Sequence, residues 1–194
     1  MSDIEDVVHV SALRIEDVKE CKLCPNLGKH HAAAVGYAKA RVMVIGDHPA
    51  TADEIESGMM FSSEWGEYIT FICDQAEMDR EEWYFTSLAK CRPHGEGQVS
   101  DENVVTCMDR WLKKEIDIVR PEVILCCGKR VWHTLVPEAQ EQVEEGKSSY
   151  APGAYLRKNG CAFIALWHPK VYVKTNNIAP FVQVGDLVAQ FLGA

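Results

Sequence analysis

The sequence lacks the features of several protein classes. It has no run of about eighteen apolar residues, the length that a membrane-spanning helix needs. Its beginning is acidic, which is not typical of a secretory signal peptide. Its 20 Lys and Arg are outnumbered by 29 Asp and Glu, so that the net charge is -9, which argues against a general nucleic-acid binder. We therefore expect a cytoplasmic monomer without membrane contacts, and any nucleic-acid footprint to be small and sensitive to salt.

The length and the order of the segments indicate one α/β domain. With 194 residues, 47% of them hydrophobic, the chain can form one core, and we expect a single domain over residues 1–194. Apolar, strand-like segments alternate with segments of helical periodicity, which predicts a three-layer α/β/α sandwich with a mainly parallel central sheet. We expect strands near 41–45, 83–88, 121–127 and 161–167, helices near 1–20, 65–78, 101–119, 129–136 and 181–192, and little regular structure over 26–40 and over 137–160 beyond a helix near 138–145.

The eight cysteines are the most informative part of the composition. A cytoplasmic protein rarely uses them as a disulfide framework, which leaves buried thiols, a metal or cluster, or redox chemistry. Cys21-x-x-Cys24 followed by Pro25 places two thiolates within reach of one metal. A redox pair and two buried thiols remain the alternatives. The adjacent His30 and His31 fit solvated loop residues better than ligands.

Polar residues follow the predicted strands at their carboxyl ends. Gly46-Asp47-His48-Pro49-Ala50 leaves the first strand, Thr86-Ser87 ends the second, and His168-Pro169-Lys170 leaves the last. In a parallel sheet these ends meet at one edge, where α/β proteins bind ligands. The sequence therefore predicts a ligand crevice there, with Cys91 and Arg92 just beyond the second strand.

Short motifs in a fixed order carry a family resemblance. They are Cys21-x-x-Cys24-Pro25, Arg41-Val-Met-Val-Ile-Gly-x-x-Pro49, Gly58-x-x-Phe61, Tyr84-x-Thr-x-x-x-Lys-Cys-Arg-Pro93, Cys107, Arg120-Pro-x-Val-Ile-x-x-x-Gly128 and His168-Pro169. Together they cover about residues 20–192, and the chain resembles the iron-sulfur uracil-DNA glycosylases, family 4 of that superfamily.

The resemblance implies a [4Fe-4S] cluster as cofactor. The family's four ligands match Cys21, Cys24, Cys91 and Cys107, and the cluster there is structural, holding loops beside the DNA. The other four cysteines are then expected not to bind iron: Cys73, Cys126, Cys127 and Cys161. Of these, Cys73, Cys126 and Cys127 are expected to be buried.

The resemblance also implies hydrolysis of an N-glycosidic bond. Such a reaction needs a donor for the departing base, a water for C1′ and a flat apolar partner for a flipped base. The family's leaving-group histidine matches His168, and its stacking phenylalanine matches Phe61. Gly46 begins the turn expected against the base. A capping or core role is the alternative for His168.

The turn after the first strand departs from the family. Where the family usually has Gly-Glu-Ala-Pro-Gly, this chain has Gly46-Asp47-His48-Pro49-Ala50, and the downstream acid most nearly matches Asp53. His48 is expected to hold the attacking water as a neutral acceptor, with Asp47 or Asp53. The alternative is that His48 contacts a phosphate or caps the turn.

The base-reading position departs as well. The family's asparagine falls on Ser87, and a hydroxyl cannot offer the paired donor and acceptor of an amide. We therefore expect a roomier pocket that accepts uracil or a modified cytosine, as in phage DNA, which would suit antiviral defence. Lys170, Lys174 and Arg92 are expected to contact DNA, with a Schiff base between Lys170 and the sugar as the alternative.

Two other function classes stay open at this point. One is a catalytically inactive module that binds DNA or protein and keeps the fold and the cluster. The other is a redox or zinc protein that uses Cys21 and Cys24, which would be colourless with zinc or would form a reversible dithiol.

Overall fold

The computed structural model of the chain describes residues 18, 20–24, 27–32, 34–93, 97–141, 150–175 and 177–193. The helix expected over residues 1–20 lies almost entirely outside these residues, as does the second half of the helix expected near 138–145.

The described strands form one main sheet and one small ribbon. The strands are β1 (Leu27–His31), β2 (Val35–Gly36), β3 (Val42–Gly46), β4 (Tyr84–Ser87), β5 (Cys91–Pro93), β6 (Val123–Cys127), β7 (Tyr155–Lys158) and β8 (Cys161–Leu166). The six-stranded sheet has the order β2-β4-β3-β6-β8-β7, and β1 pairs with β5. Its inner pairs β4-β3, β3-β6 and β6-β8 are parallel, and only the edge strands β2 and β7 are antiparallel. The prediction of a mainly parallel sheet is confirmed.

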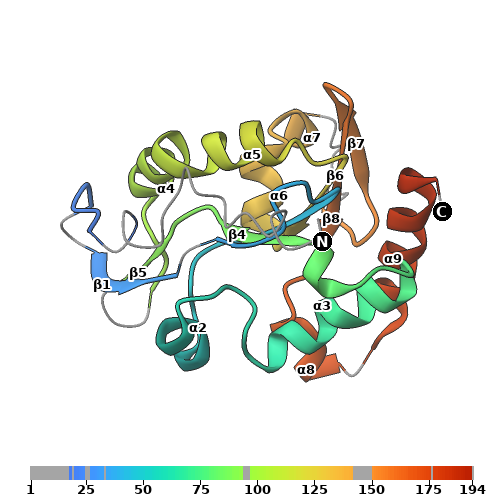
Figure 1. Ribbon diagram of the computed structural model, residues 1–194, viewed down its shortest axis with the longest axis horizontal. Coiled ribbons are helices and arrows are strands. Elements are labelled where there is room, and N and C mark those ends of the chain that lie inside the picture. The colour runs from blue at the N-terminus through green and yellow to red at the C-terminus, as the bar shows by residue number, and fades with distance from the viewer. Residues whose placement is uncertain are drawn as a thin grey trace, which may run out of the picture.

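Helices cover both faces of this sheet, as Figure 1 shows. The helices and helical turns are α2 (Ala52–Ser57), α3 (Glu64–Gln75), η1 (Arg80–Glu82), α4 (Asp101–Cys107), η2 (Met108–Leu112, a π turn), α5 (Lys113–Val119), α6 (Lys129–Leu135), α7 (Glu138–Glu141), α8 (Lys170–Thr175) and α9 (Ala179–Leu192). The expected long helix to residue 119 is thus one run interrupted by a π turn directly after Cys107.

The alternation of side chains on β3 explains the three layers. Val42 and Val44 belong to the core cluster that contains Ile69 of α3 and Val184 of α9. Met43 and Ile45 point to the opposite face of the sheet and belong to the other core cluster, together with residues of α4 to α6. Every residue of β3 and β6 is buried, as expected for strands that are covered on both faces.

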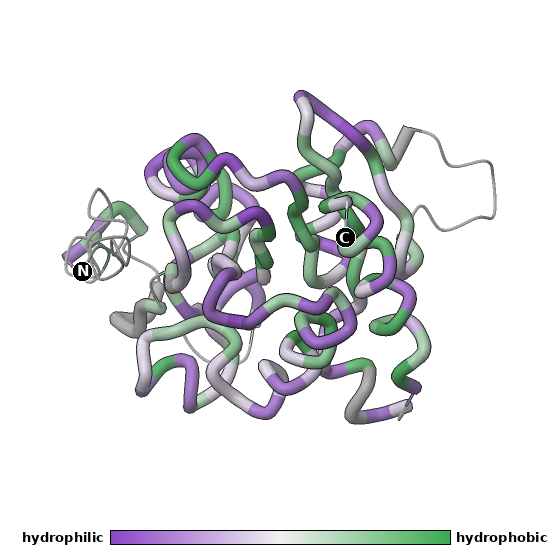
Figure 2. The backbone as a smooth tube through the Cα atoms, turned by 45° about the vertical axis from the view of Figure 1, so that its right-hand side comes forward, coloured by the Kyte–Doolittle hydropathy of each residue, from purple (hydrophilic) through white to green (hydrophobic). Residues whose placement is uncertain are grey.

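Two expectations for irregular segments are wrong. The segment 26–40 contains β1 and β2, and the segment 137–160 contains β7. β7 is an edge strand of largely exposed residues, and Figure 2 shows the hydrophilic tip of the β7–β8 hairpin projecting from the molecule. Because β7 lacks an apolar run, its sequence gives no strand signal. No helix among the described residues is long and apolar enough to cross a membrane.

Candidate active site

The carboxyl ends of β3 and β4 lie side by side at one edge of the sheet. Gly46 and Ser87 are partners in the parallel register. The following turns stay joined, since the Leu88 N–H donates to the Gly46 carbonyl at 2.9 Å and the Ala89 N–H donates to the Asp47 carbonyl at 3.0 Å. The structure therefore brings the first two predicted site segments together.

The carboxyl ends of β6 and β8 complete this edge. The Gly128 N–H donates to the Leu166 carbonyl at 2.8 Å. Gly128 has a φ of +110°, and a Cβ built there would lie 3.9 Å from the Cβ of His168. His168 therefore stands beside the end of β6, two residues after β8.

The imidazole of His168 is held in a defined orientation. The backbone N–H of Lys170 donates to its Nδ1 at 3.1 Å. Trp65 at the start of α3 meets the imidazole edge to face, with ring centroids 4.9 Å apart and planes at 81°. Because Nδ1 accepts a hydrogen bond, the neutral ring carries its proton on Nε2. Burial lowers the pKa of His168, so this neutral donor form prevails at pH 7.

His48 presents the opposite situation. Both ring nitrogens are buried and have no hydrogen-bond partner within the described chain. Burial lowers the pKa of His48, and the charges of Arg130 and Arg92 act in the same direction. A neutral ring with unoccupied nitrogens can accept a hydrogen bond from a water or a ligand.

Asp47 is already engaged in an ion pair. Its carboxylate lies 3.3 Å from Nη1 of Arg130 on α6, and both side chains are about one-fifth exposed. Nη2 of the same guanidinium donates to Asp101 at 2.6 Å and to the carbonyl of Val99. Asp47 thus fixes the turn after β3 to the beginning of α4.

The buried acid of this region is Glu54 and not Asp53. Asp53 is exposed in the first turn of α2. Glu54 is 1% exposed, and its carboxylate accepts the backbone N–H groups of Ala50 at 2.9 Å, of Thr51 at 3.1 Å and of Phe61 at 2.9 Å. Glu54 therefore joins the turn after β3 to the aromatic residue expected to stack on the base.

Phe61 lies against Gly46. A Cβ at Gly46 would be 3.1 Å from Cζ of the Phe61 ring and 3.0 Å from the Met60 methyl group, so only glycine leaves both in place. The ring also meets Phe85 edge to face at 6.2 Å, and Phe61 is 4% exposed.

Ser87 is fully buried, and its polar groups have partners. Its hydroxyl donates to the Ala89 carbonyl at 2.8 Å, and its carbonyl accepts from Nζ of Lys90 at 3.0 Å. Lys90 is itself buried and forms an ion pair with Glu115 at 2.9 Å, with the hydroxyl of Thr86 bonded to both. The roomier pocket at Ser87 remains a prediction.

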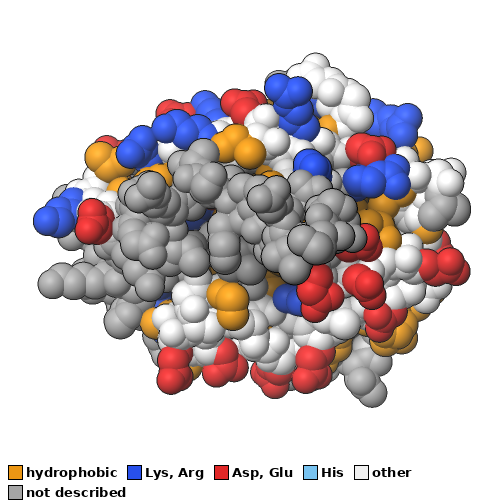
Figure 3. All heavy atoms as spheres, viewed as in Figure 1, with side chains coloured by type: hydrophobic (Ala, Val, Ile, Leu, Met, Phe, Trp, Pro, Cys, Tyr) orange, Lys and Arg blue, Asp and Glu red, His pale blue; other side chains and the backbone are white. Residues whose placement is uncertain are grey.

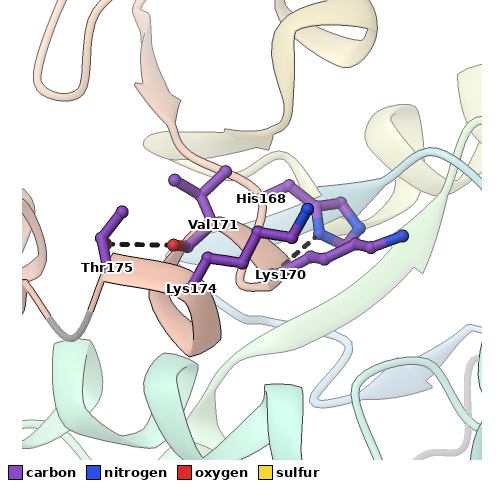
Figure 4. A pocket seen from close by; sticks show the side chains of 5 residues that line it. All are labelled: His168, Lys170, Val171, Lys174 and Thr175. Carbon is purple, nitrogen blue, oxygen red and sulfur yellow. Dashed lines mark hydrogen bonds between the residues drawn. The ribbon is translucent and has the colours of Figure 1, made fainter.

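A surface pocket lies beside His168. A pocket of about 310 Å³ is lined by His168, Lys170, Val171, Lys174 and Thr175. Figure 4 shows the amino groups of Lys170 and Lys174 extending to the same side as the imidazole. Arg92, on β5, is half-buried, and its charge acts on His48. On the face in Figure 3, Lys and Arg gather along the side of α4 and α5, and Asp and Glu along that of α2 and α3.

The four predicted ligand cysteines lie in one neighbourhood. Burial, and then the thiols of Cys107, Cys21 and Cys24, raise the pKa of Cys91 to about 12. The backbone N–H of Lys90 donates to Sγ of Cys107 at 3.3 Å. All eight cysteines are free thiols in the structure.

Four cysteine thiols are the donor set that a [4Fe-4S] cluster takes. In the described chain no three His, Cys, Asp or Glu side chains are grouped to hold one metal ion. An N–H donor to a ligand sulfur is also a known feature of such clusters. The donor set therefore fits.

Sequence reasoning missed several residues of this site. Glu54 could have been found, because Thr51-Ala-Asp-Glu54 is a capping-box pattern, and both of its hydrogen bonds are present in α2. Trp65, Arg80 and Arg130 carry no comparable local signal, since their partners are distant in the sequence.

Known proteins share this sequence pattern. The family model of the uracil DNA glycosylase superfamily matches residues 33–184. A Type-4 uracil-DNA glycosylase of Archaeoglobus fulgidus is 27% identical over 132 residues, which are 66% of this chain and 61% of that protein. A Type-4 enzyme of Saccharolobus solfataricus is 30% identical over 118 residues, or 59% of this chain and 53% of that protein. A Type-5 uracil-DNA glycosylase of Pyrobaculum aerophilum is 24% identical over 148 residues, or 69% and 63%. The chain thus spans somewhat more than half the length of these curated relatives.

Proposed function

Because the chain belongs to the uracil-DNA glycosylase superfamily, we propose that it hydrolyses the N-glycosidic bond of a flipped-out pyrimidine in DNA and leaves an abasic site. The observation that carries this proposal is the fixed tautomer of His168. Its Nδ1 is occupied by the Lys170 N–H, which leaves Nε2–H as a donor for the departing base.

The two histidines divide the reaction between them. When the bond between C1′ and the base nitrogen breaks, the base takes the electron pair, and the Nε2–H of His168 stabilises the charge on the base oxygen. A water then bonds to C1′ and ends with one proton fewer, while the base gains one. His48, whose nitrogens have no partner in the described chain, is placed to accept a hydrogen bond from that water.

Asp47 is better placed than Asp53 to help His48 position the attacking water. Asp47 is close enough to act on His48 electrostatically, although its carboxylate is paired with Arg130. Asp53 is exposed on α2 and has no comparable support. We therefore assign Asp47 to orienting the turn that carries His48, and we expect Asp53 to be dispensable.

The base would be held between Phe61 and the polar end of β4. The Phe61 ring offers a flat apolar face, and Gly46 leaves it room. Ser87 donates its only hydroxyl proton to Ala89, so it can offer the base an acceptor but no donor. A lone acceptor suits the amino group of a cytosine as well as the N3–H of uracil, whereas an amide favours uracil. Because Ser87 has no exposed surface and Phe61 is 4% exposed, contact of either residue with the base requires neighbouring side chains to move.

The substrate class follows from this weakened discrimination. We propose uracil or a modified cytosine as the base removed. Activity on hydroxymethylated or glucosylated cytosine would damage phage DNA, which is the basis for a role in antiviral defence. The pocket lined by Lys170 and Lys174, together with Arg92, is the proposed site for DNA phosphates.

A [4Fe-4S] cluster on Cys21, Cys24, Cys91 and Cys107 is the proposed cofactor. Its chemistry when bound is structural, since it would tie the segment at 21–24 to β5 and to the end of α4 without taking part in bond cleavage. Burial raises the pKa of Cys91 and of Cys107, so these thiols are protonated without a metal, and cluster binding would release their protons to solvent.

The decisive experiment compares substrates. Purified protein is incubated with duplex and single-stranded DNA containing uracil, cytosine, hydroxymethylcytosine or glucosylated cytosine, and abasic sites are revealed by alkaline cleavage. We expect wild type to favour a modified cytosine and Ser87→Asn to shift the ratio of single-turnover rates toward uracil. Efficient release of uracil with no release of any modified cytosine would leave a conventional uracil enzyme. Tight DNA binding without any abasic product would instead favour the inactive binding module, for which the full burial of Ser87 is the supporting observation.

The cofactor has its own test. Iron and acid-labile sulfide are measured in wild type, Cys107→Ala and the matched core variant Cys73→Ala. Loss of both in Cys107→Ala alone supports the ligand set. A colourless protein that contains zinc would overturn the cluster in favour of a zinc protein.

A further inference from the structure

Phe61 has a backbone conformation that its side chain disfavours. Its φ is +59°, in the left-handed region where bulky residues are uncommon. Such a residue keeps this conformation only where its surroundings enforce it, and such residues concentrate at functional sites. The turn before it begins after Gly58, which is itself left-handed at +69°.

Two charged side chains hold the peptide groups of Phe61 from opposite sides. Its N–H donates to Oε1 of Glu54 at 2.9 Å. Its carbonyl accepts from Nη2 of Arg80 at 2.9 Å. Glu54 belongs to α2 and Arg80 to η1, so the strained residue is fixed to two separate elements.

Arg80 also fixes the beginning of α3. Its Nη1 donates to the carbonyl of Gly66 at 3.1 Å and to Oγ1 of Thr70 at 3.3 Å. Gly66 lies directly under the carbonyl of Phe61, because a Cβ there would be 1.9 Å from that oxygen. The absence of a side chain at Gly66 therefore allows α3 to approach the strained turn.

Arg80 also contacts Phe85, the aromatic residue that packs against the Phe61 ring. Its Cζ lies 4.2 Å from the centroid of Phe85, and Phe85 in turn meets the Phe61 ring edge to face at 6.2 Å. Within the described chain, the donors of Arg80 are met by carbonyl and hydroxyl oxygens. The planar guanidinium donates to these oxygens in its own plane and stacks on the Phe85 ring with its face. Lysine, with a single ammonium group, cannot make both kinds of contact in this geometry.

We propose that Arg80 is a positioning residue that holds Phe61 in the conformation in which its ring stacks on the flipped base. The inference rests on the proposed function, in which Phe61 is the stacking residue. Arg80 makes no contact with the base and acts through the Phe61 carbonyl and the Phe85 ring. Arg80 and Glu54 thus enforce on Phe61 a geometry that its sequence alone disfavours.

The first experiment tests the geometry without using activity. Amide hydrogen exchange is measured over residues 58–64 in wild type, in Arg80→Met and in the matched control Arg157→Met, which removes an arginine stacked on Phe191 at 4.7 Å. We expect faster exchange of the 58–64 segment in Arg80→Met and no change there in Arg157→Met. Unchanged exchange in Arg80→Met would overturn the positioning role. If Arg80→Met does not fold, Arg80→Lys is measured in its place, with the same expectation because lysine lacks the planar fork.

The second experiment tests whether Arg80 acts through Phe61. Single-turnover rates on the preferred DNA are measured for Arg80→Met, Phe61→Ala and the double variant. We expect Arg80→Met to slow the rate by about tenfold with little change in DNA affinity, and to have almost no further effect once Phe61 is alanine. Independent, multiplying effects would overturn the proposal.

The outcomes separate the two proposals. A wild type that cleaves no base would defeat the proposed function, while hydrogen exchange would still decide the role of Arg80. An active wild type in which Arg80→Met keeps its rate would defeat the positioning role and leave the glycosylase intact.

Discussion

The exits of β3 and β8 meet at one edge of the sheet, and each carries a histidine followed by proline, but the two histidines are held differently. His168 has its Nδ1 occupied by a backbone N–H, and its ring makes a T-shaped contact with Trp65. His48 is buried to a similar extent, yet neither of its nitrogens has a partner in the described chain. A ring whose proton is placed in advance suits the stabilisation of a charge, and a ring with unoccupied nitrogens suits the capture of a mobile ligand. The two similar motifs thus support different tasks.

Removing the placed donor is expected to have the largest effect. His168→Ala should slow single-turnover base release by roughly two to three orders of magnitude, because one preorganised donor contributes about 3 to 4 kcal/mol to such transition states. DNA affinity should change little. The measurement is the rate of abasic-site formation at saturating enzyme, with Lys158→Ala on the β7–β8 hairpin as the control. An unchanged rate in His168→Ala would remove this histidine from the mechanism.

Removing the unoccupied ring should cost less, because water can still reach C1′ without it. We expect His48→Ala to slow base release by about ten- to a hundredfold and His48→Asn, which keeps an acceptor, to recover part of that loss. Asp53→Asn is the neighbouring control and should keep the wild-type rate, since its side chain is exposed. A larger loss in Asp53→Asn than in His48→Ala would reverse the roles assigned to the turn.

Acid should affect both histidines in the same direction. Burial lowers the pKa of each below its ordinary value near 6.5, so the unfolded chain binds protons there before the folded chain does. Their contribution to the free energy of unfolding is therefore complete above about pH 6.5 and is lost as the pH falls below that value. Urea unfolding of wild type and of the His48→Gln, His168→Gln double variant, at neutral and at mildly acidic pH, measures this. An equal loss in both proteins would show that other groups cause it.

The sequence alone predicted those features of the fold and the site that depend on local patterns. The buried strands predicted β3, β4, β6 and β8, and the polar residues at their ends predicted where the site lies. The sequence did not predict β7 or α2, because β7 is an exposed edge strand and α2 is only six residues long. It also pointed to Asp53, although a capping box makes Glu54 the buried acid. The contact of His168 with Trp65 joins residues far apart in the chain, and the Lys170 N–H bond to Nδ1 depends on the turn after β8, so only the folded structure reveals how the two histidines differ.

The β8 exit differs from the β3 exit in one further respect, because two lysines on α8 face the pocket beside His168. If Lys170 and Lys174 each neutralise one phosphate, replacing either by alanine should weaken DNA binding several-fold and reduce the slope of log K against log salt by about 1. The equilibrium constant is measured between about 50 and 200 mM salt, the range in which phosphate contacts dominate the change. Lys158→Ala serves as the control, since that lysine is paired with Glu138 at the hairpin far from the pocket. An unchanged slope in both α8 variants would exclude phosphate contacts.

If borohydride traps an enzyme–DNA adduct in wild type but not in Lys170→Ala, Lys170 attacks the sugar as a nucleophile, and its side chain then belongs to the bond-breaking step.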